Sequence, residues 1–301
     1  MAHILGVGIA TLDIINSVDS YPPEDAEVRA VDQQRRRGGN CTNTLAVLAQ
    51  LGHRCAWGGV IADEPDAQII LDDLGRHGID LQAVRRETRG KVPTSYVTLN
   101  RRNGSRTIVH YRDLPEFAYD DFAGIALRGY DWLHVEGRHV ADTRRMLALA
   151  RERAPALARS VEIEKARPEI ERLFDLADVL LFSRHYAHAR GFNDPERFLD
   201  AIAGETPACR RVLAWGAGGA YALDRDGRAF HSPACPPPRV VDTLGAGDVF
   251  NAGIIDALVR HAELEEALTR ACRLAGHKCG LQGLEVVVAG TTPSAVHRTT
   301  D

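Results

Sequence analysis

The stretch "VVDTLGAGDVF", residues 240–250, runs from two β-branched residues through a glycine-rich turn into an apolar segment. Gly245 and Gly247 flank Ala246 in that turn, and residues 248–261 continue with the apolar spacing of a helix. The turn is therefore expected at a helix N-terminus, where unpaired backbone N–H groups and the helix dipole favour an anion. The two glycines would let that anion approach the backbone closely.

A carboxylate, Asp248, stands at the start of this predicted helix. The helix N-terminus favours its ionised form, and a charged aspartate held in one place is a candidate general base. Aspartate is also a common helix cap. The stretch taken alone leaves both interpretations open.

The rest of the chain predicts an α/β fold around this turn. Short β-branched runs indicate buried strands at residues 3–10, 55–62, 131–136, 159–164, 178–183 and 210–216. Helical apolar spacing occupies residues 42–52, 66–78, 143–154 and 167–177. This alternation predicts one domain over residues 1–301, with a mostly parallel central sheet and helices on both of its faces. Segments 12–38 and 93–112 combine turn signals with strand alternation, and are expected to form a small β lid outside that sheet.

Composition narrows the class of partner. The 301 residues include 45% hydrophobic and 26% charged residues, which is typical of a folded, soluble protein. The formal net charge is −4 without a long basic run, so nucleic acid is not an expected partner. No apolar stretch approaches the roughly 18 residues of a membrane span. Six scattered cysteines without a CxxC pair, and an N-terminus without a signal-like apolar region, predict free thiols and a cytoplasmic protein.

A second candidate site lies near the N-terminus, in "GGNCTNTLAVLAQLG". Gly39 precedes Asn40, and Asn43 follows one helical turn later, so both amides are expected at the start of a helix. Amide side chains carry donors and acceptors together, which suits vicinal hydroxyls, although an asparagine helix cap is an alternative. Asp13 is placed at the end of the first strand, where ligands bind in open α/β sheets.

Other charged clusters have weaker interpretations. The arginine run at residues 35–37 is expected on a solvated strand edge. One strand face carries His134, Glu136 and Arg138, which indicate sugar or supporting contacts rather than a metal site, because a third metal ligand is missing. Glu162 and Glu164 imitate a glycosidase acid pair, but such pairs usually come from different elements.

The two glycine-containing motifs resemble the signatures of one enzyme family. "DTLGAGD", residues 242–248, is similar to the C-terminal signature of the ribokinase-like (PfkB) carbohydrate kinases, and "GGNCTNTLAVLAQLG" is similar to their N-terminal one. Five further stretches resemble the ketohexokinase subgroup of this family: "LDIINSVDSYPPEDAEVR", "GSRTI", "LHVEGRH", "SVEIEKAR" and "AGHKCGLQG". These stretches span residues 12–283, and they imply an ATP-dependent sugar kinase with a ribokinase-like fold.

The resemblance also implies roles for individual residues. Asp248 matches the catalytic base, and the backbone of Gly245, Ala246 and Gly247 matches the anion hole for the transferred phosphoryl group. The matched sugar-binding positions are Asp13, Gly39, Asn40, Asn43 and Asp248. Arg138 is a further candidate sugar contact because of its place on the strand face described above, not because of the resemblance. The matched nucleotide-binding positions are Arg106, Gly216, Ala217, Gly218, Gly219, Pro236, Pro237, Gly245, Gly247 and Cys272.

The resemblance implies ATP and Mg²⁺ as cofactors and leaves a requirement for K⁺ open. The sequence departs from the family pattern at two places that concern these cofactors. Ala217 and Gly218 stand where the subgroup has an acidic pair, so the backbone alone is expected to contact the nucleotide there. An NxxE motif organises magnesium in much of the family. The corresponding "FSRHYAHARGF" lacks it, as the subgroup does, and the metal ligands stay unassigned.

The expected reaction is transfer of the γ-phosphoryl group of ATP to the 1-hydroxyl of a ketohexose, with D-fructose as the favoured substrate. The alternatives are a kinase of the same family acting on another sugar, a sugar acid or a nucleoside, and a sugar-binding protein without catalysis. Open edges on two small sheets predict pairing with a second copy. The resemblance adds a homodimer through the β lid, in which Asp25 reaches the partner's sugar site.

Overall fold

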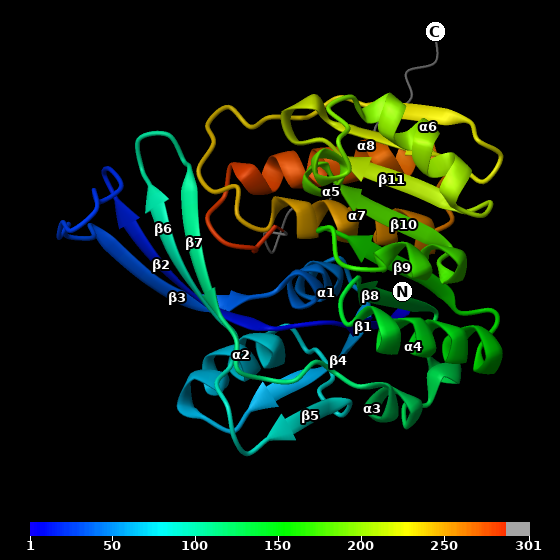
Figure 1. Cartoon of the computed structure of the whole chain (residues 1–301), viewed down its shortest axis with the longest axis horizontal. Coiled ribbons are helices and arrows are strands. Elements are labelled where there is room, and N and C mark those ends of the chain that lie inside the picture. Colours follow the sequence, from blue (N-terminus) through cyan, green and yellow to red (C-terminus); the bar gives the residue numbers. More distant parts are fainter. Residues whose placement is uncertain (287–301) are drawn as a thin grey trace, which may run out of the picture.

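The computed structural model describes residues 1–286, and its centre is a nine-stranded sheet (Figure 1). The strand order is β13-β12-β11-β10-β9-β8-β1-β4-β5, with parallel pairing from β11 to β5 and antiparallel pairing of β11, β12 and β13. The strands are β1 (His3–Val7), β4 (Arg54–Ala62), β5 (Val84–Glu87), β8 (Trp132–Glu136), β9 (Ala158–Ile163), β10 (Val179–Ser183), β11 (Arg210–Ala214), β12 (Ala220–Leu223) and β13 (Ala229–Ser232).

A second, four-stranded sheet projects from one side of the molecule, and we call it the small sheet (Figure 1). It consists of β2 (Thr11–Val18), β3 (Asp32–Gly38), β6 (Thr94–Asn100) and β7 (Arg106–Tyr111) in the order β3-β2-β6-β7. The pairs β2–β3 and β6–β7 are antiparallel, whereas β2 and β6 run parallel. That the small sheet works as a lid, and that the whole chain is one domain, stay predictions.

Helices cover both faces of the central sheet. One group packs together behind the sheet in Figure 1 and comprises α1 (Asn40–Gln50), α7 (Ala246–Val259) and α8 (Leu264–Cys279). The opposite face carries α3 (Tyr119–Ala123), α4 (Val140–Arg153), α5 (Arg184–Ala189), α6 (Pro195–Glu205) and the 3₁₀ helices η1 (Leu127–Gly129) and η2 (Ile170–Leu176). Helix α2 (Pro65–Arg76) instead packs against β2 and β3, at the base of the small sheet.

Two sequence expectations differ from the observed elements. Residues 167–177 were expected to form an α-helix, but they form the 3₁₀ helix η2, which begins after Pro168 and a left-handed Glu169 with φ 61°. Asp13 does not end the first strand. It is the third residue of β2, because β1 stops at Val7 and the chain enters the small sheet after three residues.

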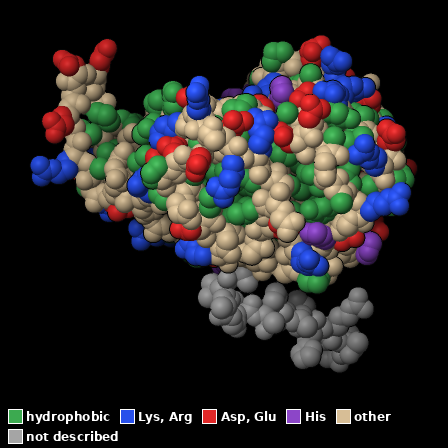
Figure 2. Space-filling view, turned by 90° about the horizontal axis from the view of Figure 1, so that it is seen from below, with side chains coloured by type: hydrophobic (Ala, Val, Ile, Leu, Met, Phe, Trp, Pro, Cys, Tyr) green, Lys and Arg blue, Asp and Glu red, His purple; other side chains and the backbone are tan. Residues whose placement is uncertain are grey.

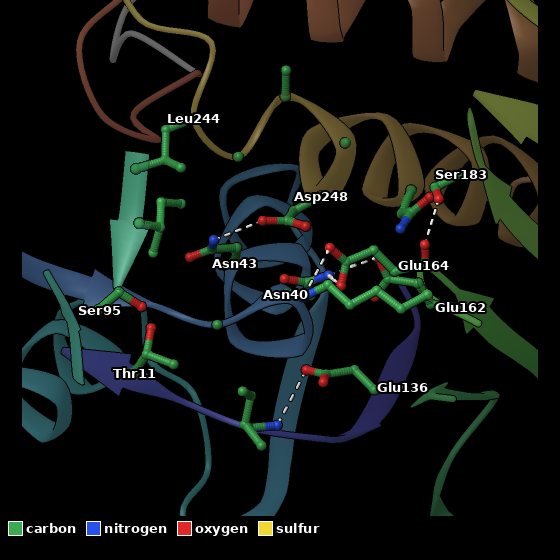
Figure 3. A pocket seen from close by; sticks show the side chains of 18 of the residues that line it. Thr11, Asn40, Asn43, Ser95, Glu136, Glu162, Glu164, Ser183, Leu244 and Asp248 are labelled. Atoms are coloured by element: carbon green, nitrogen blue, oxygen red, sulfur yellow. Dashed lines mark hydrogen bonds and ion pairs between the residues drawn. The ribbon is translucent and has the colours of Figure 1, made fainter. Parts of the chain in front are cut away.

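The two sheets meet where three connections converge. β1 leads into β2, β3 leads into α1, and the loop after β13 leads into α7, so the N-termini of α1 and α7 face the base of the small sheet (Figure 3). Within residues 1–286 no helix is long and apolar enough to cross a membrane. All six cysteines are free, as expected.

Candidate active site

A cavity of about 600 Å³ lies between the small sheet, the carboxyl ends of the central strands and the N-terminus of α7. Sequence-predicted residues that line it are Asp13, Gly39, Asn40, Asn43, Arg106, Arg138, Gly245, Ala246, Gly247 and Asp248. Residues 13 and 248 are separated by most of the chain, and the fold brings them to one cavity. The structure therefore gathers the predicted sugar positions and the predicted anion hole in one place.

The N-terminus of α7 has the backbone geometry that the glycines suggested. Gly245 is the N-cap residue with φ 82°, a left-handed conformation that side chains rarely adopt. A Cβ atom at Gly245 would also lie 2.8 Å from Leu284, whereas one at Gly247 would meet no atom within 4 Å. Gly247 therefore leaves open space beside the first helical N–H groups. An anion can reach those groups from the cavity.

Asp248 lies in the first turn of α7 and is only 7% exposed. The Asn43 amide nitrogen donates to Asp248 Oδ2 over 2.7 Å (Figure 3). Burial raises the pKa of Asp248 to about 8, against the Asn43 hydrogen bond and the Arg37 charge, while Glu164 and Glu136 add to the rise. The helix N-terminus favours the ionised form of this carboxyl, whereas burial opposes it.

Acidic side chains surround Asn40 on the other side of the cavity. Its amide nitrogen donates to Glu162 Oε1 over 3.0 Å and to Glu164 Oε2 over 3.2 Å (Figure 3). Glu162 Oε2 is buried without a hydrogen-bond partner in the described residues. Burial, followed by the charges of Asp248 and Glu136, raises the pKa of Glu162 well above its usual value. These glutamates support Asn40 at the rim of the cavity and do not form a glycosidase pair.

Glu136 has a structural role beneath the same cavity. Its Oε1 accepts from the backbone nitrogens of Ile9 and Cys41, over 3.1 and 2.8 Å. Figure 3 shows Glu136 below Asn40 and Asp248. Burial raises the pKa of Glu136, although the nearby Arg138 charge and the two N–H groups oppose that rise. Glu136 thereby joins the turn after β1 to the first turn of α1.

Asp13 and Gly39 form the wall next to the small sheet. Thr11 Oγ1 donates to Asp13 Oδ1 over 2.9 Å, and burial raises the pKa of Asp13 against the hydrogen bonds of Thr11 and Ser95. Gly39 has φ 102°, and a Cβ atom there would lie 2.4 Å from the Ile9 carbonyl oxygen. A side chain at residue 39 would therefore push α1 away from the cavity.

Two arginines reach the cavity from opposite sides. Arg106, at the start of β7, donates to Thr243 Oγ1 over 3.1 Å, beside the α7 turn. Arg138 follows β8 and pairs with Glu116 over 2.8 Å and with Glu136 over 3.7 Å. Arg138 lines the cavity with its charge already partnered, whereas the Arg106 guanidinium has no carboxylate partner within residues 1–286 and donates to the Thr243 hydroxyl.

The remaining nucleotide-binding predictions form a separate surface next to α8. Gly216, Ala217 and Gly218 form the 3₁₀ helix η3 (Gly216–Gly218), and Gly219 closes it with φ 85°. A Cβ atom at Gly219 would lie 2.1 Å from the carbonyl oxygen of Ser232. The Cys272 thiol of α8 donates to that same oxygen over 3.8 Å. Pro237, which follows Pro236, lies close to the end of α8, since a Cβ atom at Gly280 would be 3.0 Å from it. These residues do not line the main cavity.

Asp25 is remote from the cavity of its own chain. It is exposed, with φ 58°, in the loop between β2 and β3. In Figure 2 the tip of the projecting part carries acidic side chains. The exposed acids of that loop are Asp19, Glu24, Asp25 and Glu27. A contact of Asp25 with a sugar site would need a second chain.

Arg37 is the first residue whose importance the sequence did not indicate. The expectation of a solvated strand edge is met by Arg35, whose side chain is 45% exposed, but it is wrong for Arg37, which is 5% exposed. Arg37 Nη1 donates to Asn43 Oδ1 over 2.7 Å, and its Nε donates to Asp73 Oδ2 over 2.5 Å. The burial depends on Asp73 in α2, a partner distant in sequence.

Lys278 in α8 is the second residue that sequence reasoning missed. It is fully buried, and its ammonium group donates to the Asp242 carbonyl over 2.6 Å and lies 3.3 Å from Asp242 Oδ2. Asp242 also accepts from Leu244 N, Gly283 N and Arg36. Lys278 therefore supports the turn that leads into the anion hole. A signal existed, because residue 278 falls on the apolar stripe of α8 that buries Leu264, Ala267, Leu268 and Ala271.

Metal binding by side chains alone is not indicated in residues 1–286, where no three His, Cys, Asp or Glu side chains group as ligands. A magnesium ion carried by nucleotide phosphates usually keeps several waters and has few protein ligands.

A family model and known proteins provide the comparison for this site. The model of the pfkB family carbohydrate kinases matches residues 1–286. This chain belongs to the PfkB family of carbohydrate kinases. Mouse ketohexokinase is 41% identical over 294 residues, which cover 95% of this kinase and 99% of the mouse protein.

More distant proteins share the whole length of the kinase. An ATP-dependent ribose-1-phosphate kinase from Halopiger xanaduensis is 24% identical over 94% of each chain. Arabidopsis thaliana ribokinase, solved in complex with ribose and ATP, has a TM-score of 0.79 at 20% identity over 94% of each chain. The predicted ribokinase-like α/β fold and the predicted sugar kinase are confirmed.

Proposed function

We propose that this kinase transfers the γ-phosphoryl group of ATP to the 1-hydroxyl of D-fructose. The observation that carries the proposal is the position of Asp248: it is buried at the α7 N-terminus, beside open space at Gly247 and across the cavity from Asn40 and Asp13. The identity to mouse ketohexokinase supports a ketohexose as the acceptor.

In the proposed reaction the sugar lies between Asp13, Asn40 and Asp248, with its 1-hydroxyl on the Asp248 carboxylate. Asp248 takes the hydroxyl proton as the oxygen attacks the γ-phosphorus, and the proton remains on Oδ1 or Oδ2. The N–H groups of Gly245, Ala246 and Gly247 receive the phosphoryl oxygens, where charge develops. A pKa of about 8 suits this role, because a general base works best with a pKa near the operating pH.

The nucleotide approaches from the surface formed by residues 216–219, 236–237 and Cys272. This surface borders the end of α8, since a Cβ atom at Gly280 would lie 3.0 Å from Pro237. The segment that leads to the α7 turn meets the same end of α8, where the backbone nitrogen of Val241 bonds to Cys279 O. In this proposal Arg106 contacts the phosphates from the small sheet, which its position on the cavity wall supports. Bound Mg²⁺ supplies positive charge that stabilises the transferring phosphoryl group.

Initial-rate assays of ADP release on a panel of sugars test the substrate. We expect the highest kcat/KM for D-fructose, ahead of ribose, adenosine and fructose 6-phosphate. The arginines 35–37 do not line the main cavity. The cations that do are Arg106, Arg138, Lys165 and Arg167, of which Arg138 and Lys165 are paired with Glu116 and Glu164. A kcat/KM at least tenfold higher for another acceptor, about 1.4 kcal/mol in transition-state binding, would overturn the choice of fructose.

We further propose that the kinase is a homodimer joined through the small sheet. Its exposed apolar side chains are Tyr96, Ile108, Val109 and Tyr111, each at least 43% exposed. The acidic loop at residues 19–27 is opposite in charge to the arginines of a second cavity, of about 710 Å³, that borders the small sheet. Arginines line that cavity: Arg36, Arg101, Arg102, Arg106 and Arg239.

Mixing two inactive variants tests the dimer and the role of Asp25 together. We expect Asp25→Asn and Asp248→Asn each to lower turnover sharply. Mixed dimers would contain one site with both carboxylates intact, so mixing should restore roughly a quarter of the wild-type rate. A monomeric, fully active enzyme in light scattering at the assay concentration would contradict the dimer.

A further inference from the structure

Four polar side chains form a continuous chain from α2 to the proposed base. Asp73 Oδ2 accepts from Arg37 Nε, Arg37 Nη1 donates to Asn43 Oδ1, and Asn43 Nδ2 donates to Asp248 Oδ2. The three distances are 2.5, 2.7 and 2.7 Å. The side chain of Arg37 is 2% exposed, so water does not compete for its hydrogen bonds.

The chemistry of Arg37 determines which way the Asn43 amide faces. A guanidinium group carries only donors, so the Asn43 atom that faces it must be the amide oxygen. The amide nitrogen then has to point at Asp248. A donor placed there stabilises the carboxylate, whereas an amide turned the other way would accept a hydrogen bond from the protonated acid.

Asp73 holds the guanidinium in this orientation. Burial by itself would raise the pKa of Asp73, but the charge and hydrogen bond of Arg37, with the charges of His77 and Arg76, keep it below its usual value. Arg76 Nη2 donates to the second carboxylate oxygen over 2.6 Å. Asp73, in α2, therefore stays ionised, while Arg37 is the second-to-last residue of β3.

We propose that Arg37 is a positioning residue that fixes the Asn43 amide so that its nitrogen donates to Asp248, and that Asp73 holds Arg37 in place. This inference rests on the proposed role of Asp248 as the base. We call the hydrogen-bonded chain Asp73–Arg37–Asn43–Asp248 the relay. It connects α2 and β3 to the reacting carboxylate. It gives the third arginine of the run 35–37 a role that its neighbours on β3 do not share.

The groups around Asp248 act in opposite directions. Those that face it are Arg37 from β3, Cys41 and Asn43 from α1, Glu136 from β8, and Glu162 and Glu164 at the end of β9. The three glutamates and burial favour the protonated acid, while Arg37 and Asn43 favour the carboxylate. Loss of Arg37 removes its charge and releases the Asn43 amide, and both changes favour protonation.

The test is a direct titration of the Asp248 carboxyl in the whole enzyme. Carbon-13 NMR of protein labelled at the aspartate Cγ gives the titration midpoint, and the signal missing from Asp248→Asn identifies the residue. In Arg37→Met we expect the midpoint to rise by about one pH unit, which is tenfold in the protonation equilibrium. The rising limb of kcat/KM against pH should move equally, so kcat/KM at pH 7 falls about tenfold and recovers at higher pH.

Matched variants separate positioning from a general loss of stability. Arg35→Met makes the same change at an exposed position of β3, and we expect the wild-type midpoint and rate. Arg37→Lys keeps the charge but not the fork of donors, and Asp73→Asn removes the anchor. Each should raise the midpoint by less than Arg37→Met does. These two variants also carry the test if Arg37→Met does not fold.

The outcomes distinguish this inference from the proposed function. A folded Arg37→Met enzyme, or folded Asp73→Asn and Arg37→Lys enzymes, with the wild-type midpoint would overturn the positioning role, even if Asp248→Asn is inactive. A raised midpoint supports the relay. If the midpoint rises while Asp248→Asn keeps its turnover, the relay stands and the assignment of the base falls.

Discussion

Asp248→Asn should lower kcat by at least about 10²-fold and leave the dissociation constant for the sugar nearly unchanged. The amide keeps the shape of the side chain and can still bond to the sugar hydroxyl, but it cannot accept a proton from it. A loss of this size is within the range for removal of a general base. Steady-state kinetics with ATP and fructose, together with calorimetry of sugar binding, measure both quantities.

Val249→Ala at the next position of α7 serves as the matched control, because it changes a buried side chain without touching the cavity lining. It should lower the stability and retain most of the turnover of the folded enzyme. Wild-type kcat in Asp248→Asn would mean that the proton leaves by another route.

Lys278→Met should lower the free energy of unfolding by about 3 kcal/mol, the lower end of the cost of breaking a buried ion pair, because Asp242 keeps its pair with Arg36. Burial alone would raise the pKa of Asp242, but the charges of Lys278 and Arg36 hold it below its usual value. Without Lys278 the turn at residues 242–247 also loses the support of its first carbonyl. Urea denaturation at pH 7 gives the unfolding free energy.

A surface lysine provides the comparison for that variant. Lys165 is 53% exposed and lies 3.5 Å from Glu164, so Lys165→Met should change the free energy of unfolding by less than about 1 kcal/mol. Equal stability of the two variants would show that the ammonium group of Lys278 does not stabilise the turn.

Local patterns were sufficient to predict six of the nine strands of the central sheet and the α7 turn, but not β5, β12 or β13. The six predicted strands bury nearly every side chain, and the glycines of the turn suit a helix N-terminus. Asp248 and Asn40 could be found because each follows a glycine motif, whereas Asp13 was found from an expected strand end and lies inside β2.

Contacts between residues far apart in the sequence could not be predicted from local patterns. Arg35, Arg36 and Arg37 are identical residues in sequence, and only their partners in space, Asp66, Asp242 and Asp73, distinguish an exposed charge from a buried relay. The protonation of Asp248 also depends on Glu136 and Glu164, which come from other strands. Helix position alone indicated the opposite direction for its pKa.

The most direct test of the proposed reaction is phosphorus NMR of the product made from ATP and D-fructose labelled with carbon-13 at C1. Transfer to the 1-hydroxyl predicts a new phosphate ester signal, split by coupling to the labelled carbon, that grows as ADP accumulates. An ester signal without that splitting, or ADP release that does not depend on the sugar, would contradict transfer to the fructose 1-hydroxyl.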